Sequence, residues 1–362
     1  MTETNKAATR PETPASPEIT GIVLGGGGSR GSYEIGVLQT LTSQKKAFDV
    51  VTGTSIGAIC GAVYVQGSVQ DLTDWIGTFT QDSVASNLFM FPAQYTSAGH
   101  NYSSAGDFFA DFSQGGPGIS PLRDKLKGLF SYEKFAASPM KFGCLSYNVS
   151  RQQPQSFTKN DMNPDNAVDV LLASAAYFPA FNFITMNGEY YIDGGFAQTN
   201  PVSLARDLGA GKLVLVDVQD MDVPDPDLAP GDLLIRPIWK LAYYLDFDGK
   251  TLKNQVALGQ LDALKYLDLA PGYLYTFYPE DWNHMKRLEK SAMELVAAEG
   301  ESYLLEKMDG VMKEIYQFIL GYVPRPLQNR YANEYIFERI LECMGLIAGI
   351  SPFSQLHFND FI

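Results

Sequence analysis

A serine flanked by glycines offers the first chemistry in this sequence. Gly53, Ser55 and Gly57 form a G-x-S-x-G pattern between the apolar residues 50–51 and a segment of small and apolar residues, 56–67. The pattern is typical of a nucleophile elbow, in which a sharp strand-to-helix turn presents the serine hydroxyl at the edge of a sheet. Glycines are needed there because the turn brings neighbouring backbone too close for a Cβ atom. We therefore interpret Ser55 as a candidate nucleophile.

A serine nucleophile needs a base, and the sequence favours a carboxylate over an imidazole. The chain contains three histidines, none of them in a segment that we interpret as a strand end of the sheet: His100, His284 and His357. Asp193 ends a predicted strand and is followed by Gly194 and Gly195, which let backbone crowd a neighbour. An aspartate that starts an ordinary turn is the alternative interpretation. As a general base, Asp193 needs burial to raise its basicity.

Four consecutive glycines, 25–28, follow the strand-like residues 22–24 and precede residues 33–41, whose apolar positions recur at helical spacing. This junction exposes backbone N–H groups at a helix N-terminus, where negative charge is favoured. Acyl transfer produces a transient negative oxygen that preorganised N–H groups stabilise. We expect Arg30 to hold this loop through hydrogen bonds to nearby carbonyls. The candidate oxyanion-hole residues are Gly26, Gly27 and Gly28.

Strand and helix patterns alternate from residue 21 to about residue 218, which predicts an α/β fold with a mainly parallel sheet and helices on both faces. Asn200 is expected to cap a helix that begins at Pro201 and is followed by Gly209. After the first strand and helix, the predicted strands are 48–55, 140–149, 188–195 and 212–218, and the predicted helices are 56–67 and 167–177.

Composition and charge narrow the classes of function. The chain has 362 residues, of which 45% are hydrophobic, and this indicates a globular protein. A formal net charge of −14 disfavours nucleic acid as a partner and electrostatic docking to an anionic membrane. Three widely spaced cysteines fit buried thiols in a reducing compartment. No apolar run is long enough for a transmembrane helix. We expect a cytoplasmic protein.

Three motifs together resemble the patatin-like phospholipase family, whose pattern is a G-G-G-x-R-G loop, a G-x-S-x-G elbow and a D-G-G or D-G-A turn. Here they are residues 26–31, ending in Gly31, then 53–57 and 193–195, and the stretch 171–181 ("LLASAAYFPAF") is similar as well. The resemblance implies a three-layer α/β/α fold and a lipid acyl hydrolase of the phospholipase A or lysophospholipase type. It further implies a Ser55–Asp193 dyad that works through an acyl-enzyme, without metal or cofactor, on a lipid or membrane-surface substrate.

The chain divides into three predicted parts. Residues 1–18 are polar and are expected to form a flexible tail, 19–280 a patatin-like acyl-hydrolase domain, and 281–362 a C-terminal helical extension. Residues 83–120 are loop-rich and aromatic, and we interpret them as a surface insertion that serves as a lid for lipid entry.

Two other enzyme classes fit parts of the pattern. Gly26, Gly28 and Gly31 also satisfy the dinucleotide fingerprint G-x-G-x-x-G, but that fold wants an acidic residue at the far end of the second strand, whereas Asp49 precedes its strand. A Ser55, Asp193, His284 triad has the chain order of an α/β-hydrolase. Too few residues precede the elbow to form the strands which that fold places before its nucleophile.

Three further alternatives remain open on the sequence. The chain could keep the fold as a non-catalytic or regulatory lipid-binding protein, or it could cleave small soluble acyl esters or thioesters. The acidic stretch 220–227 invites a calcium site, but it lacks the glycine and the distal glutamate of an EF-hand loop and is better explained as a solvated turn.

Overall fold

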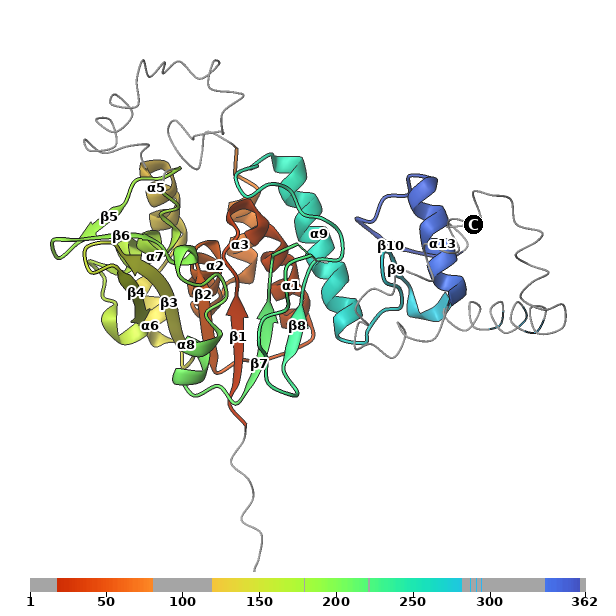
Figure 1. Ribbon diagram of the computed structural model, residues 1–362, viewed down its shortest axis with the longest axis horizontal. Coiled ribbons are helices and arrows are strands. Elements are labelled where there is room, and N and C mark those ends of the chain that lie inside the picture. Colours follow the sequence, from red (N-terminus) through yellow and green to blue (C-terminus); the bar gives the residue numbers. More distant parts are fainter. Residues whose placement is uncertain are drawn as a thin grey trace, which may run out of the picture.

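A computed structural model gives the fold. It describes residues 18–80, 119–178, 180–220, 222–281 and 336–358, with the isolated positions 287, 291 and 294. The predicted insertion 83–120, except for its last two residues, and the predicted tail, except for residue 18, lie outside the described residues. An eight-stranded sheet with helices around it forms the centre of the described chain (Figure 1).

Parallel pairing dominates this sheet, in which seven strands are hydrogen-bonded neighbours in the order β5-β6-β3-β2-β1-β7-β8 and the eighth, β4, pairs with β3 outside this path. The parallel strands are β1 (Thr20–Leu24), β2 (Val50–Thr54), β3 (Lys141–Asn148), β7 (Lys212–Val216) and β8 (Leu233–Ile235). Strands β4 (Gln153–Thr158) and β6 (Glu189–Asp193) run antiparallel to β3, and β5 (Ile184–Met186) pairs antiparallel with β6. The prediction of a mainly parallel sheet is confirmed.

The register of β3 brings two strand ends together. Ser146 pairs with β4 on one edge and with Asp193 of β6 on the other. Its neighbour Leu145 pairs with Thr54 of β2 on that same second edge. Because β2 runs parallel to β3 and β6 antiparallel, the carboxyl ends of β2 and β6 meet head to head. The residues that follow Thr54 and those at the end of β6 therefore face each other.

Helices flank the sheet on both faces. They are α1 (Gly31–Ser43), α2 (Ile56–Val65), α3 (Val69–Ile76), α5 (Ser120–Leu129), α6 (Tyr132–Ala137), α7 (Ala167–Ala175), α8 (Val202–Asp207), α9 (Gly249–Tyr266) and α13 (Ile336–Ile347). Ile22 and Leu24 face the larger core cluster and Val23 faces the smaller one beside α8, as the two-residue period of a strand requires. None of the described helices is both long and apolar enough to cross a membrane.

The start of α8 differs from the prediction. The helix begins at Val202 with Pro201 as its N-cap residue, and the side chain of Asn200 makes no capping hydrogen bond. Instead the Asn200 side chain lies against Gly25, and the main-chain carbonyl of Asn200 accepts from the N–H of Val202 at 2.8 Å. Gly209 follows the helix with φ 103°, as expected for a left-handed residue after a helix end.

A small C-terminal unit joins two distant parts of the chain (Figure 1). Strand β9 (Thr276–Phe277) pairs in parallel with β10 (Gln355–Leu356), and α13 lies beside them. Most of the predicted helical extension between residues 282 and 335 lies outside the described residues, so the division of the chain into three parts stays a prediction.

Candidate active site

Ser55 occupies a strained turn between β2 and α2. Its φ of 58° lies in the left-handed region, which costs a non-glycine residue conformational energy and is common at functional sites. Two hydrogen bonds stabilise the turn. The N–H of Ser55 donates to Oγ of Ser174 at 2.9 Å, and that hydroxyl donates to the carbonyl of Leu145 at 2.6 Å. Ser174 on α7 thus fixes the elbow, a role that the sequence analysis did not assign.

The glycines on either side of Ser55 let three backbone segments meet. A Cβ at Gly57 would lie 2.7 Å from the carbonyl oxygen of Gly25 and closer still to that of Leu24. A Cβ at Gly53 would collide with the main chain of Gly57. The close approach of β1, β2 and α2 is therefore possible only with glycine at these positions, as the sequence pattern indicated.

Asp193 lies within direct hydrogen-bonding distance of Ser55. The Ser55 Oγ donates to Oδ2 of Asp193 at 2.6 Å, and the other oxygen, Oδ1, accepts from the N–H of Gly195 at 2.7 Å. A Cβ at Gly194 would strike the carbonyl of Leu145, so glycine lets η5 (Gly194–Phe196) turn tightly after β6. Asp193 is only 3% exposed.

Burial decides the ionisation of Asp193. Desolvation raises the pKa of this carboxyl from 3.8 to about 6, and the hydrogen bonds from Ser55 and Gly195 offset part of that increase. A carboxyl with such a pKa is ionised near neutral pH, yet it is a stronger base than an exposed aspartate. This is the property that a general base opposite a serine requires.

The glycine loop lies over Ser55, because a Cβ at Gly26 would lie 3.4 Å from that of Ser55. The N–H of Gly26 donates to the carbonyl of Thr199 at 2.9 Å, so this N–H already has an acceptor. Within the described ranges the N–H groups of Gly27 and Gly28 have no acceptor. The oxyanion role of the three glycines stays a prediction, for which Gly27 and Gly28 offer the N–H groups without an acceptor.

Arg30 is buried and holds the loop to the segments that follow β7 and β8. Its Nε donates to the carbonyl of Ala242 at 2.8 Å and its Nη1 to that of Val218 at 3.0 Å. The guanidinium carbon lies 4.3 Å from the ring centre of Tyr244, and Nη2 pairs with Asp220. Gly31, the next residue, leaves room for the side chain of Ile56 at the start of α2.

Gln219 and Tyr244 brace the same loop from the side, and neither was singled out in the sequence. The amide of Gln219 donates to the carbonyl of Gly26 at 3.4 Å and accepts from the hydroxyl of Tyr244 at 3.1 Å. Both residues follow strands of the sheet in segments without a recognisable motif. Only the three-dimensional structure brings them to the site.

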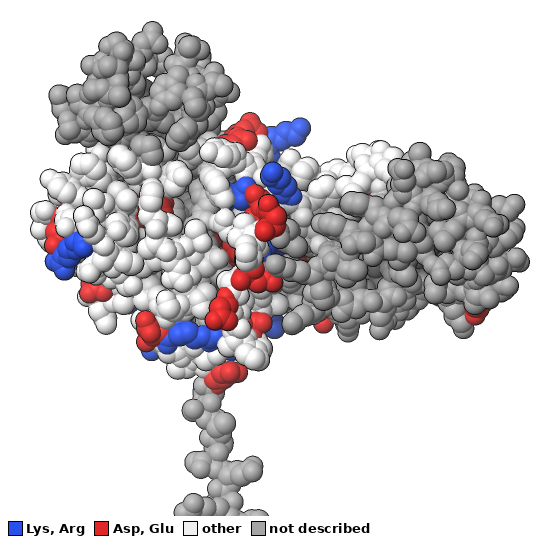
Figure 2. Space-filling view, in the orientation of Figure 1, with Lys and Arg blue, Asp and Glu red and all other residues white. Residues whose placement is uncertain are grey.

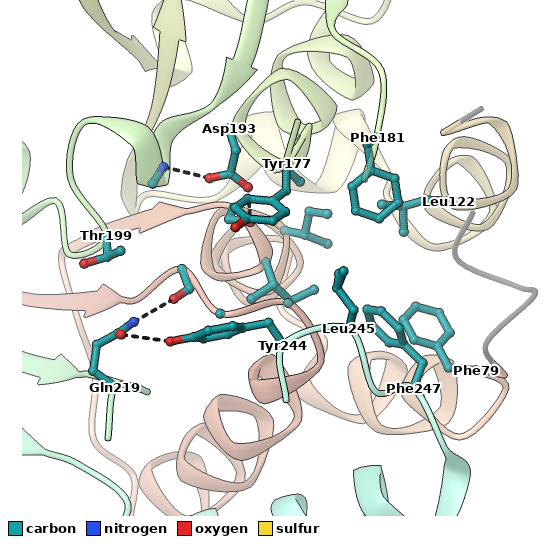
Figure 3. Close-up of a pocket in the computed structure, with 18 residues that line it drawn as sticks. Phe79, Leu122, Tyr177, Phe181, Asp193, Thr199, Gln219, Tyr244, Leu245 and Phe247 are labelled. Carbon is teal, nitrogen blue, oxygen red and sulfur yellow. Dashed lines mark hydrogen bonds between the residues drawn. The ribbon is translucent and has the colours of Figure 1, made fainter. Parts of the chain in front are cut away.

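A pocket of about 250 Å³ opens beside Ser55 and Asp193, and its two ends differ in polarity (Figure 3). Thr199, Gln219 and Asp193 lie toward one end. Aromatic and aliphatic side chains face one another at the other end: Phe79, Leu122, Phe181, Leu245 and Phe247. The pocket therefore offers a path for an apolar chain that leads to the serine hydroxyl.

The remaining candidates lie elsewhere or outside the described residues. His357 pairs with Asp281 through Nδ1 at 3.0 Å and stacks on Tyr278. His100 and the proposed triad member His284 lie outside the described residues. Asp220, in the acidic stretch 220–227, pairs with Arg30. Among the residues that the structure describes, no cluster of His, Cys, Asp and Glu is arranged to hold a metal ion.

Comparison with protein families identifies the chain. The family model described as patatin-like phospholipase matches residues 22–206, slightly more than half of the sequence. This range contains the glycine loop, the elbow and the Asp-Gly-Gly turn. The chain therefore belongs to the patatin-like phospholipase family, and the resemblance seen in its motifs is confirmed.

Curated relatives are similar at low identity. Lysophospholipase NTE1 of Phaeosphaeria nodorum is 28% identical over 215 residues, which cover 59% of this chain and 13% of that protein. NTE1 of Pyricularia oryzae is 25% identical over 304 residues, with coverage of 81% and 19%. The patatin-like phospholipase domain-containing protein ZK370.4 of Caenorhabditis elegans is 23% identical over 209 residues, with coverage of 56% and 14%. The matched part spans less than a fifth of each of these relatives.

Two solved structures are similar at lower identity still. VipD from Legionella pneumophila aligns with a TM-score of 0.44 and 13% identity, covering 96% of this chain and 90% of that one. The type III effector protein ExoU aligns with a TM-score of 0.36 and 15% identity, covering 84% and 63%.

Proposed function

We propose that this chain hydrolyses fatty-acyl esters of lipids with Ser55 as nucleophile and Asp193 as general base. The hydrogen bond of 2.6 Å between the Ser55 hydroxyl and the buried Asp193 carboxylate, beside an apolar pocket, carries the proposal. The activity is assigned to residues 19–280.

The reaction proceeds in two steps. Asp193 accepts the proton of the Ser55 hydroxyl while Oγ attacks the ester carbonyl, and the N–H groups of Gly27 and Gly28 stabilise the negative oxygen of the tetrahedral intermediate. The intermediate expels the alcohol, which takes the proton from Asp193, and leaves an acyl-enzyme. Asp193 then removes a proton from a water molecule that attacks the acyl-enzyme. Collapse of the second intermediate returns the proton to Ser55 and releases the fatty acid.

The polarity of the pocket orients the substrate. With its carbonyl at Ser55, an ester places its acyl chain between Phe181, Leu122 and Phe247, where burial of apolar surface is favourable. The alcohol then lies toward Thr199 and Gln219. The relatives named lysophospholipase support a phospholipid substrate of the phospholipase A or lysophospholipase type. Hydrolysis of small soluble esters is the alternative that a substrate series separates.

A fluorophosphonate probe tests the nucleophile. We expect the parent chain to be labelled at Ser55 and to cleave lysophosphatidylcholine faster than p-nitrophenyl butyrate. Ser55→Ala and Asp193→Asn are expected to lower kcat/KM by at least about 10³-fold on both substrates. Ser203→Ala, which changes an exposed serine on α8, is the matched control and keeps full activity. Labelling at another serine, or an active Ser55→Ala chain, would refute the dyad.

A further inference from the structure

Three exposed aromatic side chains gather beside the active-site pocket. Tyr177, Phe196 and Tyr243 are 47%, 51% and 62% exposed, and together they are called the aromatic rim. They come from three separate segments: the turn after α7, the short helix η5 after Asp193, and the loop between β8 and α9. Large exposed aromatics cost free energy in water, so their convergence on one site needs an explanation.

Contacts between these side chains hold the rim together. The rings of Tyr177 and Phe196 stack with centres 5.8 Å apart, and the rings of Tyr243 and the pocket residue Tyr244 lie 5.8 Å apart. Tyr177 lines the pocket together with Tyr244 and Asp193, and partial burial raises the pKa of Tyr177. The rim is therefore continuous with the entrance to the site.

Two of the three segments that form the rim carry no charge, and the third has Lys240 before Tyr243 and Asp246 and Asp248 after it. The chain has no Asp, Glu, Lys or Arg at residues 170–188 or 194–205. Figure 2 shows the result as a broad area with few charged side chains over the region of β6 and α7. With a net charge of −14, no cation in these two segments and a single lysine beside two aspartates in the third, the surface lacks the cluster of basic residues that binds anionic headgroups.

We propose that the aromatic rim docks onto the interface of a zwitterionic phospholipid membrane or micelle. Tyrosine rings prefer the headgroup level of such an interface, where the ring is partly dehydrated and the hydroxyl still reaches water, and a phenylalanine ring is buried at the boundary with the acyl chains. Docked in this way, the pocket mouth opens onto the acyl chains, and a lipid reaches Ser55 without crossing bulk water. This direction of entry rests on the proposed function, whereas docking itself does not.

Flotation with vesicles of dialkyl-ether phosphatidylcholine tests the docking, because these lipids have no acyl ester to hydrolyse. We expect the parent chain to bind them. The double variant Phe196→Ser/Tyr243→Ser should bind at least about tenfold more weakly, because it lacks two half-exposed rings whose apolar surface would be buried on docking. Neither added phosphatidylserine nor a change in salt concentration should strengthen binding. Ile347→Ser, which removes a 70% exposed apolar side chain on α13, is the matched control and should bind like the parent.

Hydrolysis of p-nitrophenyl butyrate separates docking from catalysis and from misfolding. The double variant should keep the parent rate on this soluble ester, and Tyr243→Trp should bind vesicles more tightly than the parent. An unchanged affinity of the double variant, no binding by the parent, or binding that needs anionic lipid would each overturn the docking surface. Self-association of the parent that the double variant abolishes, without vesicle binding, would assign the rim to a second copy of the chain instead. An active Ser55→Ala chain refutes the proposed function and leaves the docking result standing.

Discussion

Asp193 meets two opposing requirements. In the proposed mechanism it must be negative to accept a proton from Ser55, yet it is 3% exposed, and burial disfavours the charged form. The two hydrogen bonds that it accepts, from Ser55 and Gly195, keep its pKa from rising beyond about 6. The residue is thus more basic than an exposed aspartate and is still ionised at neutral pH.

The pH dependence of catalysis should follow this carboxyl. We expect kcat/KM for an uncharged soluble ester to be constant above neutral pH and to fall as the pH drops through about 6, because a protonated Asp193 cannot accept the serine proton. A stopped-flow or plate assay over a pH series measures the midpoint of this fall in kcat/KM. A midpoint near 4, the ordinary value for an exposed aspartate, would contradict the environment that we describe.

Stability should change in the opposite direction. Because folding raises the pKa of Asp193, the native chain binds more protons than the unfolded chain between pH 3.8 and about 6, so the free energy of unfolding decreases as the pH rises through that window. Above that pH window, the ionised carboxylate lowers the free energy of unfolding by up to about 3 kcal/mol. Asp193→Asn should therefore raise Tm near neutral pH, and the gain should shrink on acidification. A lower Tm for Asp193→Asn at neutral pH would show that the charge of Asp193 does not destabilise the folded chain.

At the scale of elements, the helices and strands predicted most accurately are those whose local sequence pattern agrees with their packing in the fold. The elbow strand 48–55 and the helix that follows it appear as β2 and α2. Both the glycine spacing and the apolar runs indicate a buried strand-to-helix turn at this place. Strand β4 was not predicted, since its polar, partly exposed residues carry no apolar alternation. Helix α9 was not predicted either. Asp248 caps it, but the loop before it contains no recognisable motif.

The site followed the same rule. Ser55 and Asp193 stand in motifs that can be recognised locally, whereas Ser174 and Gln219 act through positions that only the packing of α7 and β7 determines. The hydrogen bond from the N–H of Gly26 to Thr199 could not be predicted either, because Thr199 is far away in sequence. The motifs identify the groups that we propose to react, and the packing of the sheet and helices determines which side chains contact them.

The elbow predicts a sharp contrast between two helical glycines. Gly57→Ala should destabilise the chain by about 3 kcal/mol or more and lower activity, because its Cβ would meet the carbonyls of β1. Gly128→Ala in α5 is the matched control: no atom lies within 4 Å of the added Cβ, and the substitution should stabilise by about 0.5–1 kcal/mol. Chemical denaturation measures both. Equal effects of the two substitutions would exclude close packing as the reason for Gly57.

The elements around the pocket predict an effect on chain length. Phe79 follows α3 and Phe247 precedes α9, and their rings meet edge to face with centres 6.1 Å apart at the apolar end of the pocket. Phe247→Leu should shift the preferred acyl chain to a longer one, because a smaller side chain lengthens the apolar path. A series of p-nitrophenyl esters measures the shift in kcat/KM. Tyr190→Leu, on β6 and away from the pocket lining, should leave the preference unchanged.

At the scale of the whole molecule, buried polar pairs connect segments that are distant in sequence. Arg236 after β8 pairs with Asp217 after β7, and both are almost fully buried. Tyr33 on α1 donates to Asp262 on α9 at 3.0 Å, and Asp262 pairs with Lys265. Such groups are stabilising only while every partner is present, since an unpaired buried polar group costs the full desolvation penalty. The molecule is therefore most sensitive where one side chain satisfies two partners.

Glu342 on α13 is such a side chain. It is fully buried, and its Oε1 accepts from the N–H of Tyr273 at 2.7 Å and from that of Tyr275 at 3.0 Å, just ahead of β9. Glu342→Ala leaves both N–H groups without this acceptor and should lower the free energy of unfolding by about 2–5 kcal/mol. Glu342→Gln keeps an acceptor oxygen and should cost less. Because neither the pocket nor the dyad includes this segment, kcat/KM on a soluble ester below the unfolding temperature should stay unchanged in both variants. A loss of activity in the folded Glu342→Gln chain would instead show that the C-terminal unit is coupled to the active site.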